Sequence, residues 1–89
     1  MLVLPEELTH VQATACLELL RQGLGSESGH QVVVDASRLS RFDSAALAVL
    51  LEFRRESLAL GKDFSISALP NRLRDLATLY GIVDLLQAQ

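Results

Sequence analysis

The sequence predicts an α/β fold in which helices pack against a small, mostly parallel sheet. Three observations predict it: strand-like and helix-like segments alternate, the helix-like segments carry apolar stripes, and glycine or proline separates most of them. Such alternation implies parallel strands joined by right-handed crossovers. The 89 residues suit a single domain covering 1–89, since a domain usually takes about 100–200 residues.

The first third of the chain predicts a strand and then a helix. Residues 2–4 can form a short strand at the weak edge of the sheet, stopped by Pro5. A helix is expected from Thr9, because Thr9 and Gln12 fit a capping box. Gly23 or Gly25 should end it. Its core face is expected at helical spacing, on Ala13, Cys16, Leu17, Leu20 and Leu24.

The middle third contains an uninterrupted β-branched run from Val32 to Val34. This run predicts a strand over residues 31–36, and it is typical of a central parallel strand buried on both faces. After a connection over residues 37–42, Asp43 or Ser44 should cap a second helix that ends at Gly61.

The last third predicts a strand over residues 63–68 and a third helix. Pro70 suits the first turn of that helix, which should continue to Gly81. Residues 82–86 can add a short helical piece. The strand is expected to place one set of side chains on the core face and the other set on the opposite face. These sets are Phe64, Ile66 and Ala68 against Ser65 and Ser67.

Composition argues against several classes of function. A net charge of −3 with three Phe, one Tyr and no Trp argues against nucleic-acid binding. A single cysteine, Cys16, fits a reducing cytosol. No apolar stretch reaches the length of about 18 residues that a transmembrane helix needs, so we expect no direct membrane insertion. The N-terminus does not resemble a signal peptide.

The usual signatures of catalysis and of cofactor binding do not occur in the sequence. There is no glycine-rich phosphate motif and no nucleophile–base pair among sequence neighbours, so no cofactor and no enzyme are expected. His10 and His30 lie far apart in sequence, and a metal site would need further clustered ligands. Cys16 lies on the apolar stripe of the first helix and is expected to be a small core residue.

The segment over residues 35–47 is the strongest candidate for a functional site. It follows the carboxyl end of the central strand and leads into the second helix, where parallel α/β folds usually bind their ligands. The alternative is a plain strand–loop–helix connection with Asp43 or Ser44 as the N-cap. The two interpretations are compatible, because a cap can also be part of a binding surface.

The second helix carries two apolar stripes where a surface helix needs one. Two stripes indicate either deep burial between neighbouring elements or an exposed apolar patch for a partner. In so small a domain we expect the partner. The stripes consist of Leu47, Leu50, Leu51 and Leu58, and of Ala46, Val49, Phe53 and Leu60.

These residues resemble the motif of the STAS domain family, which includes the anti-sigma-factor antagonists and the tails of sulfate transporters. A hydrophobic strand ends in Asp35, a loop with Leu39 follows, and residues 42–47 (Phe-Asp-Ser-Ala-Ala-Leu) open a helix. Pro70 and the residues around Tyr80 are similar to the closing helix of the family. The likeness covers residues 2–86. Residues 46–51 and 76–81 most resemble MlaB-like STAS domains, the small subunits of Mla-type ABC transporters.

The resemblance implies a non-catalytic cytoplasmic subunit that is peripheral to the inner membrane through its transporter complex. Such a subunit binds the ATPase subunit and supports phospholipid trafficking, which maintains outer-membrane lipid asymmetry. By the same resemblance, the surface for the ATPase subunit would comprise Arg41, Asp43, Ser44, Ala45, Leu47 and Ala48.

Two departures from the family pattern leave alternatives open. In anti-sigma-factor antagonists a kinase phosphorylates the second Ser of the motif, but that position is Ala45 here, so this switch should be absent. An antagonist phosphorylated at Ser44 remains the alternative, if the motif is shifted by one residue so that Ser44 takes the place of its second Ser. By the same resemblance we expect the first strand of the family to be missing, which would leave an open sheet edge and allow a homodimer.

Overall fold

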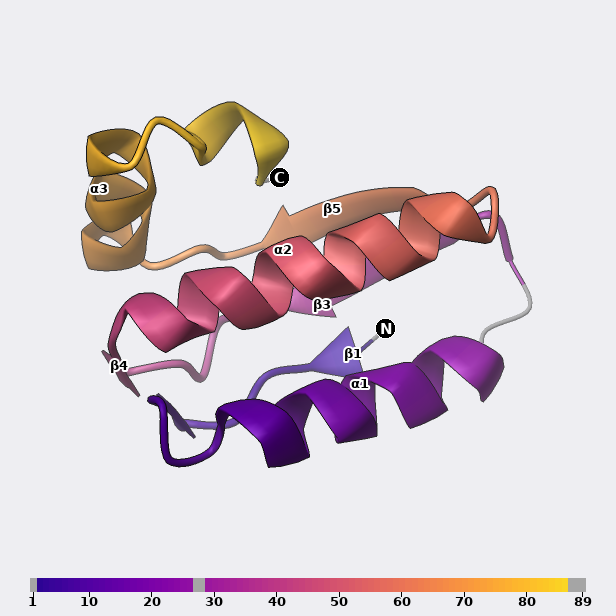
Figure 1. Cartoon of the computed structure of the whole chain (residues 1–89), viewed down its shortest axis with the longest axis horizontal. Helices are drawn as coiled ribbons and strands as arrows, with labels where there is room; N and C mark the ends of the chain where they lie inside the picture. The colour runs from indigo at the N-terminus through magenta and orange to yellow at the C-terminus, as the bar shows by residue number, and fades with distance from the viewer. Residues whose placement is uncertain (1, 27–28, 87–89) are drawn as a thin grey trace.

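The computed structural model describes residues 2–26 and 29–86. Three parallel strands form a sheet in the order β1-β3-β5, and β2 pairs with β4, also in parallel (Figure 1). The predicted alternation, parallel pairing and edge position of β1 are confirmed, but the β2–β4 pair was not predicted. The elements are β1 (Leu2–Val3), β2 (Glu7–Leu8), α1 (Ala13–Ser26), β3 (Gln31–Asp35), β4 (Arg41–Phe42), α2 (Ser44–Ala59), β5 (Asp63–Ser67), α3 (Asn71–Leu79) and the 3₁₀ turn η1 (Val83–Leu85).

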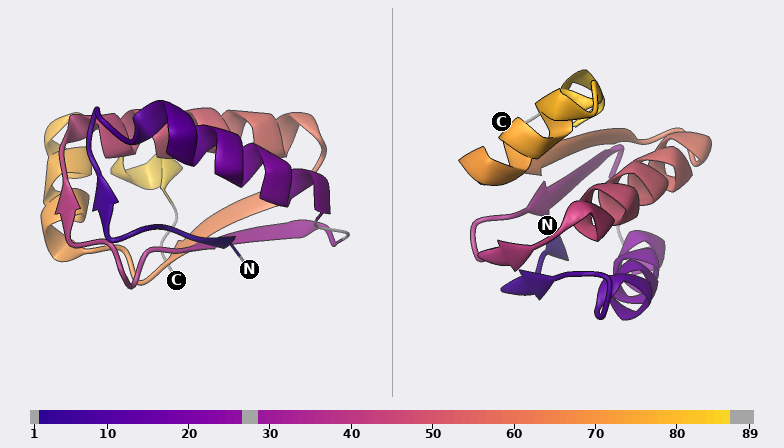
Figure 2. Two further views of the ribbon diagram at one scale, coloured as in Figure 1. Left: turned by 90° about the horizontal axis from the view of Figure 1, so that it is seen from below. Right: turned by 60° about the vertical axis from the view of Figure 1, so that its left-hand side comes forward.

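Helices α1 and α2 lie side by side on one face of the three-stranded sheet (Figure 2). In the central strand β3, Val32 and Val34 are buried, whereas Val33 is half-buried and Gln31 is exposed. Burial on both faces of this strand was therefore a wrong prediction. Side chains alternate between the two faces of a strand, and these two helices cover only one face.

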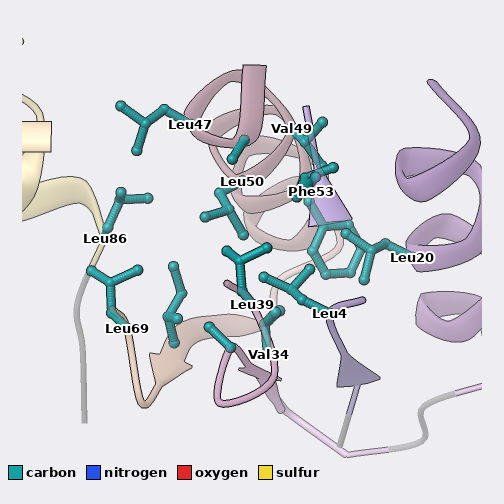
Figure 3. Close-up of a cluster of buried hydrophobic side chains, with 14 of the residues drawn as sticks. Leu4, Leu20, Val34, Leu39, Leu47, Val49, Leu50, Phe53, Leu69 and Leu86 are labelled. Carbon is teal, nitrogen blue, oxygen red and sulfur yellow. The ribbon is translucent and has the colours of Figure 1, made fainter. Parts of the chain in front are cut away.

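Helix α2 lies at the centre of the core, where leucine, valine and alanine side chains from the sheet and the other helices surround it (Figure 3). Phe53 is fully buried and packs edge-on against Phe64 of β5, with ring centroids 6.2 Å apart. The two apolar stripes are buried along most of the helix, so the expected exposed patch was a wrong prediction. Among the large apolar side chains of the two stripes, only Leu58 and the C-cap residue Leu60, at the end of the helix, are exposed.

Helix α1 begins later and ends later than the sequence predicts. Residues 9–12 form a turn in which Gln12 Oε1 accepts hydrogen bonds from the Thr9 amide (2.9 Å) and the Thr9 hydroxyl (2.8 Å). The Thr9 hydroxyl oxygen accepts from the Val11 amide (3.2 Å) and not from the Gln12 amide, so the capping box is only half formed, and the helix starts at Ala13. Gly23 and Gly25 lie inside the helix. A side-chain carbon at Gly23 would overlap Leu2, so this glycine lets α1 approach β1.

The chain turns sharply after β5. Ala68 has a φ of 59° and is exposed, so the predicted core position at Ala68 is wrong and Leu69 takes the buried place. Pro70 precedes α3 as its N-cap, one residue before the expected first turn. The short turn η1 confirms the predicted helical piece after Gly81.

Candidate partner-binding surface at the start of helix α2

Asp43 holds the start of α2 and the turn before α1 together. Its Oδ1 accepts a hydrogen bond from the Ala45 amide (2.8 Å), which is the predicted N-cap contact. Its Oδ2 accepts another from the His10 amide (3.1 Å) and lies 3.1 Å from His10 Nδ1. These contacts, chiefly those with His10, hold the pKa of Asp43 below its ordinary value.

The β2–β4 pair fixes the loop that precedes α2. The amides of Ser40 and Arg41 donate to the Glu6 carbonyl at 2.9 and 3.0 Å. From the other side, the guanidinium of Arg72 lies 5.4 Å from the centre of the Phe42 ring, a cation–π contact between α3 and β4. Strand pairing and this ring contact therefore position the start of α2 independently of its cap.

The predicted surface residues differ in their exposure. Arg41, Ser44 and Ala48 are exposed, and Asp43 and Ala45 are half-buried. Leu47 is only 3 % exposed and lies on the side of α2 that faces Leu86 (Figure 3). Leu47 therefore packs in the core and is not open to a partner, which corrects its predicted place on this surface. The structure brings the remaining five residues together at one end of the molecule.

A shallow apolar groove runs between α1 and α2 beside this surface. Ala45 and Ala48 of α2 form one wall, and Ala13, Thr14 and Leu17 of α1 form the other. Val49 also lines the groove. Sequence reasoning missed the α1 residues, because their apolar spacing predicts a core face and does not show which helix lies alongside. Small side chains on both walls leave room for a side chain of another protein.

Within residues 2–26 and 29–86, no group of three His, Cys, Asp or Glu side chains is arranged to hold a metal ion. Cys16 is buried, and burial raises the pKa of its thiol. In the same described part of the chain, no helix is both long and apolar enough to cross a membrane.

Comparison with known families supports this reading of the fold. The family model described as "Mlab, STAS domain" matches residues 1–87. The chain belongs to this STAS family. The match includes every strand and helix described above, so the predicted family and fold are confirmed. The comparison with curated proteins found no match for this STAS domain.

Proposed function

We propose that this STAS domain is the non-catalytic subunit of an Mla-type phospholipid ABC transporter and binds the ATPase subunit through the start of α2. It would act in the cytoplasm, held at the inner membrane by its partner. One observation carries the proposal: Ala45 and the exposed Ala48 line an apolar groove directly after the exposed Ser44, at the place where the STAS motif opens its helix. Membership in the MlaB-type family supports the choice of partner.

The surface is organised before any partner arrives. The Asp43 carboxylate joins the start of α2 to the turn before α1, and strand pairing holds the preceding loop. A preorganised surface loses little conformational freedom on binding, so a larger part of the contact energy contributes to affinity. Arg41 of β4 is exposed before the start of α2, with its guanidinium 3.9 Å from the Glu7 carboxylate, and could turn to a carboxylate of the partner.

Co-purification with the ATPase subunit tests the proposal. Replacing Ser44 by Arg places a long charged side chain on the first residue of α2, next to the groove-lining Ala45, and should weaken the complex at least about tenfold, which corresponds to about 1.4 kcal/mol. Asn71→Arg is the matched control, because Asn71 is likewise exposed and is the first residue of α3. Circular dichroism should show both variants folded. An intact complex with Ser44→Arg would reject this surface.

The alternative is an anti-sigma-factor antagonist that is switched by phosphorylation of Ser44. The exposed hydroxyl at a helix N-terminus favours it, because the helix dipole stabilises a phosphate there. The adjacent Asp43 carboxylate opposes it by charge repulsion. Incubation with a cognate kinase and ATP, followed by intact-mass measurement, decides between the two. We expect no mass gain, and a full single phosphate on Ser44 would favour the antagonist.

A further inference from the structure

Strand β1 leaves one of its edges unpaired within the described part of the chain. Leu2 lies opposite Val34 and Val3 opposite Asp35, and the Leu4 amide donates to the Asp35 carbonyl at 2.9 Å. Backbone groups of alternate residues point to the same side of a strand, so Leu2 and Leu4 face β3. The N–H and C=O groups of Val3 therefore point outward, and such edge groups readily pair with another strand.

An apolar groove lies beside this edge, between β1 and α1. Ala15 and Leu19 of α1 line it together with Val3 and Pro5, and the buried Cys16 lies at its base. Val3 is 51 % exposed and Leu19 is 67 % exposed, so two sizeable apolar side chains meet water here. Exposed apolar surface beside an unpaired strand edge favours association with an extended segment of protein.

The rim of the groove carries one acidic and one basic side chain, Glu7 and Arg38, whose ion pairs with Arg41 and Glu6 of the same chain are exposed and long, at 3.9 Å each. A two-fold symmetric interface uses the same patch on both molecules, so the patch must complement itself. This patch does so in two respects. Val3 supplies one outward donor and one outward acceptor, and the rim supplies charges of opposite sign.

We propose that a second copy of this chain docks here, with the two β1 strands antiparallel about a two-fold axis at Val3. Each Val3 then faces its counterpart, and the pair exchanges two N–H···O=C hydrogen bonds. The two Val3 side chains form a cross-strand contact, and the two three-stranded sheets join into one. Pro5 has no N–H and cannot extend the ladder, which favours a single register.

The proposed dimer contact is separate from the proposed ATPase surface. The groove beside β1 and the groove between α1 and α2 share no lining residue. The dimer can therefore be tested independently of the transporter role. A failure of one proposal is recognisable, because Ser44→Arg should weaken ATPase binding and leave the dimer intact.

Light scattering of the full chain after size-exclusion chromatography, over a concentration series, tests the dimer. The mass should rise with concentration from 9.7 kDa towards twice that value. Val3→Lys and Leu19→Glu each place a charge on an exposed position of the patch, so the fold should persist and the dimer should dissociate at least about tenfold more readily. Leu79→Glu is the control, because Leu79 is 79 % exposed on α3 and should leave the dimer unchanged.

Three results would overturn the proposal. The first is a monomer at every concentration up to about the millimolar range, beyond which a contact is too weak to be a specific dimer. The second is a dimer that both patch variants leave unchanged, or that Leu79→Glu disrupts equally. The third is a monomer whose Val3 amide becomes protected from hydrogen exchange only when the ATPase subunit is added, because the edge would then serve a different partner.

Discussion

At the scale of single residues, Asp43 connects more of the structure than its place in a short motif indicates. One carboxylate caps α2 and also holds the backbone of His10, 33 positions earlier in the chain. The sequence predicted the cap from the residue type alone. The contact with His10 depends on how the two helices pack, and no local pattern contains that information.

This arrangement predicts a stability loss in acid that depends on Asp43. Hydrogen bonds to the ionised carboxylate lower its pKa in the folded state. Their stabilisation is fully present above the unfolded pKa of about 3.9 and disappears as the pH falls through the lower folded value. Asp43→Asn keeps a capping side chain but cannot titrate. Urea unfolding measures the free energy of unfolding at about pH 5 and about pH 2.5. Between these two pH values it should fall less for this variant than for the wild type.

Asp75→Asn is the control for this measurement, because Asp75 is exposed on α3. The fall in its free energy of unfolding between the two pH values should match that of the wild type. An Asp43→Asn variant with the same acid loss as the wild type would show that the His10 contacts do not stabilise the folded state.

At the scale of elements, two glycines illustrate opposite roles. Gly61 follows the end of α2 with a φ of 75°, a conformation in which L side chains are strained. Gly25 lies in the last turns of α1, where an added side-chain carbon would meet open space. Sequence alone could not separate them, because glycine after an apolar helical pattern is a normal stop signal in both places.

Replacing each glycine by alanine should therefore change stability in opposite directions. Gly61→Ala should lower the free energy of unfolding by about 1 kcal/mol, because the left-handed conformation is costly with a Cβ. Gly25→Ala should raise it by about 0.5–1 kcal/mol, because alanine favours a helix and loses less entropy on folding. Thermal and urea unfolding measure both effects. A loss of stability in Gly25→Ala would mean that α1 ends before residue 25 in solution.

At the scale of the whole molecule, α2 is the central support of the core. It is buried against α1 on one side and against β5 and α3 on others, so its apolar residues serve the interior over most of the helix. The proposed partner surface is then small and lies at the start of the helix. Under this proposal, folding and partner binding use different residues of the same element.

Leucine truncations in the core and on the surface should separate these roles. Leu50→Ala removes a fully buried side chain of α2 and should cost about 2–5 kcal/mol, a large part of the stability of a small domain. Leu79→Ala shortens an exposed leucine of α3 and should change the free energy of unfolding by no more than about 0.5 kcal/mol. Urea unfolding measures both. A similar cost for the two variants would contradict the packing described for α2.

Much of the fold was predictable, because strands and helices leave local signatures. The valine run predicted β3, the alternation around Phe64 and Ile66 predicted β5, and Asp43 predicted the start of α2. The two-residue strands β2 and β4 were missed, since segments so short have no periodicity to recognise. Their pairing arises only once residues 7–8 and 41–42 meet in space.

The sequence by itself determined the order of the helices and of the three main strands, the parallel sheet and the family, because periodicity, caps and a short motif are local properties of the chain. The tertiary structure decided which apolar residues remain available to partners. It buried Leu47, placed α1 beside Ala45 and Ala48, and left Val3 exposed at the edge of the sheet. The physical reason is that burial depends on neighbours from distant parts of the chain, and a hydrophobic pattern does not identify those neighbours.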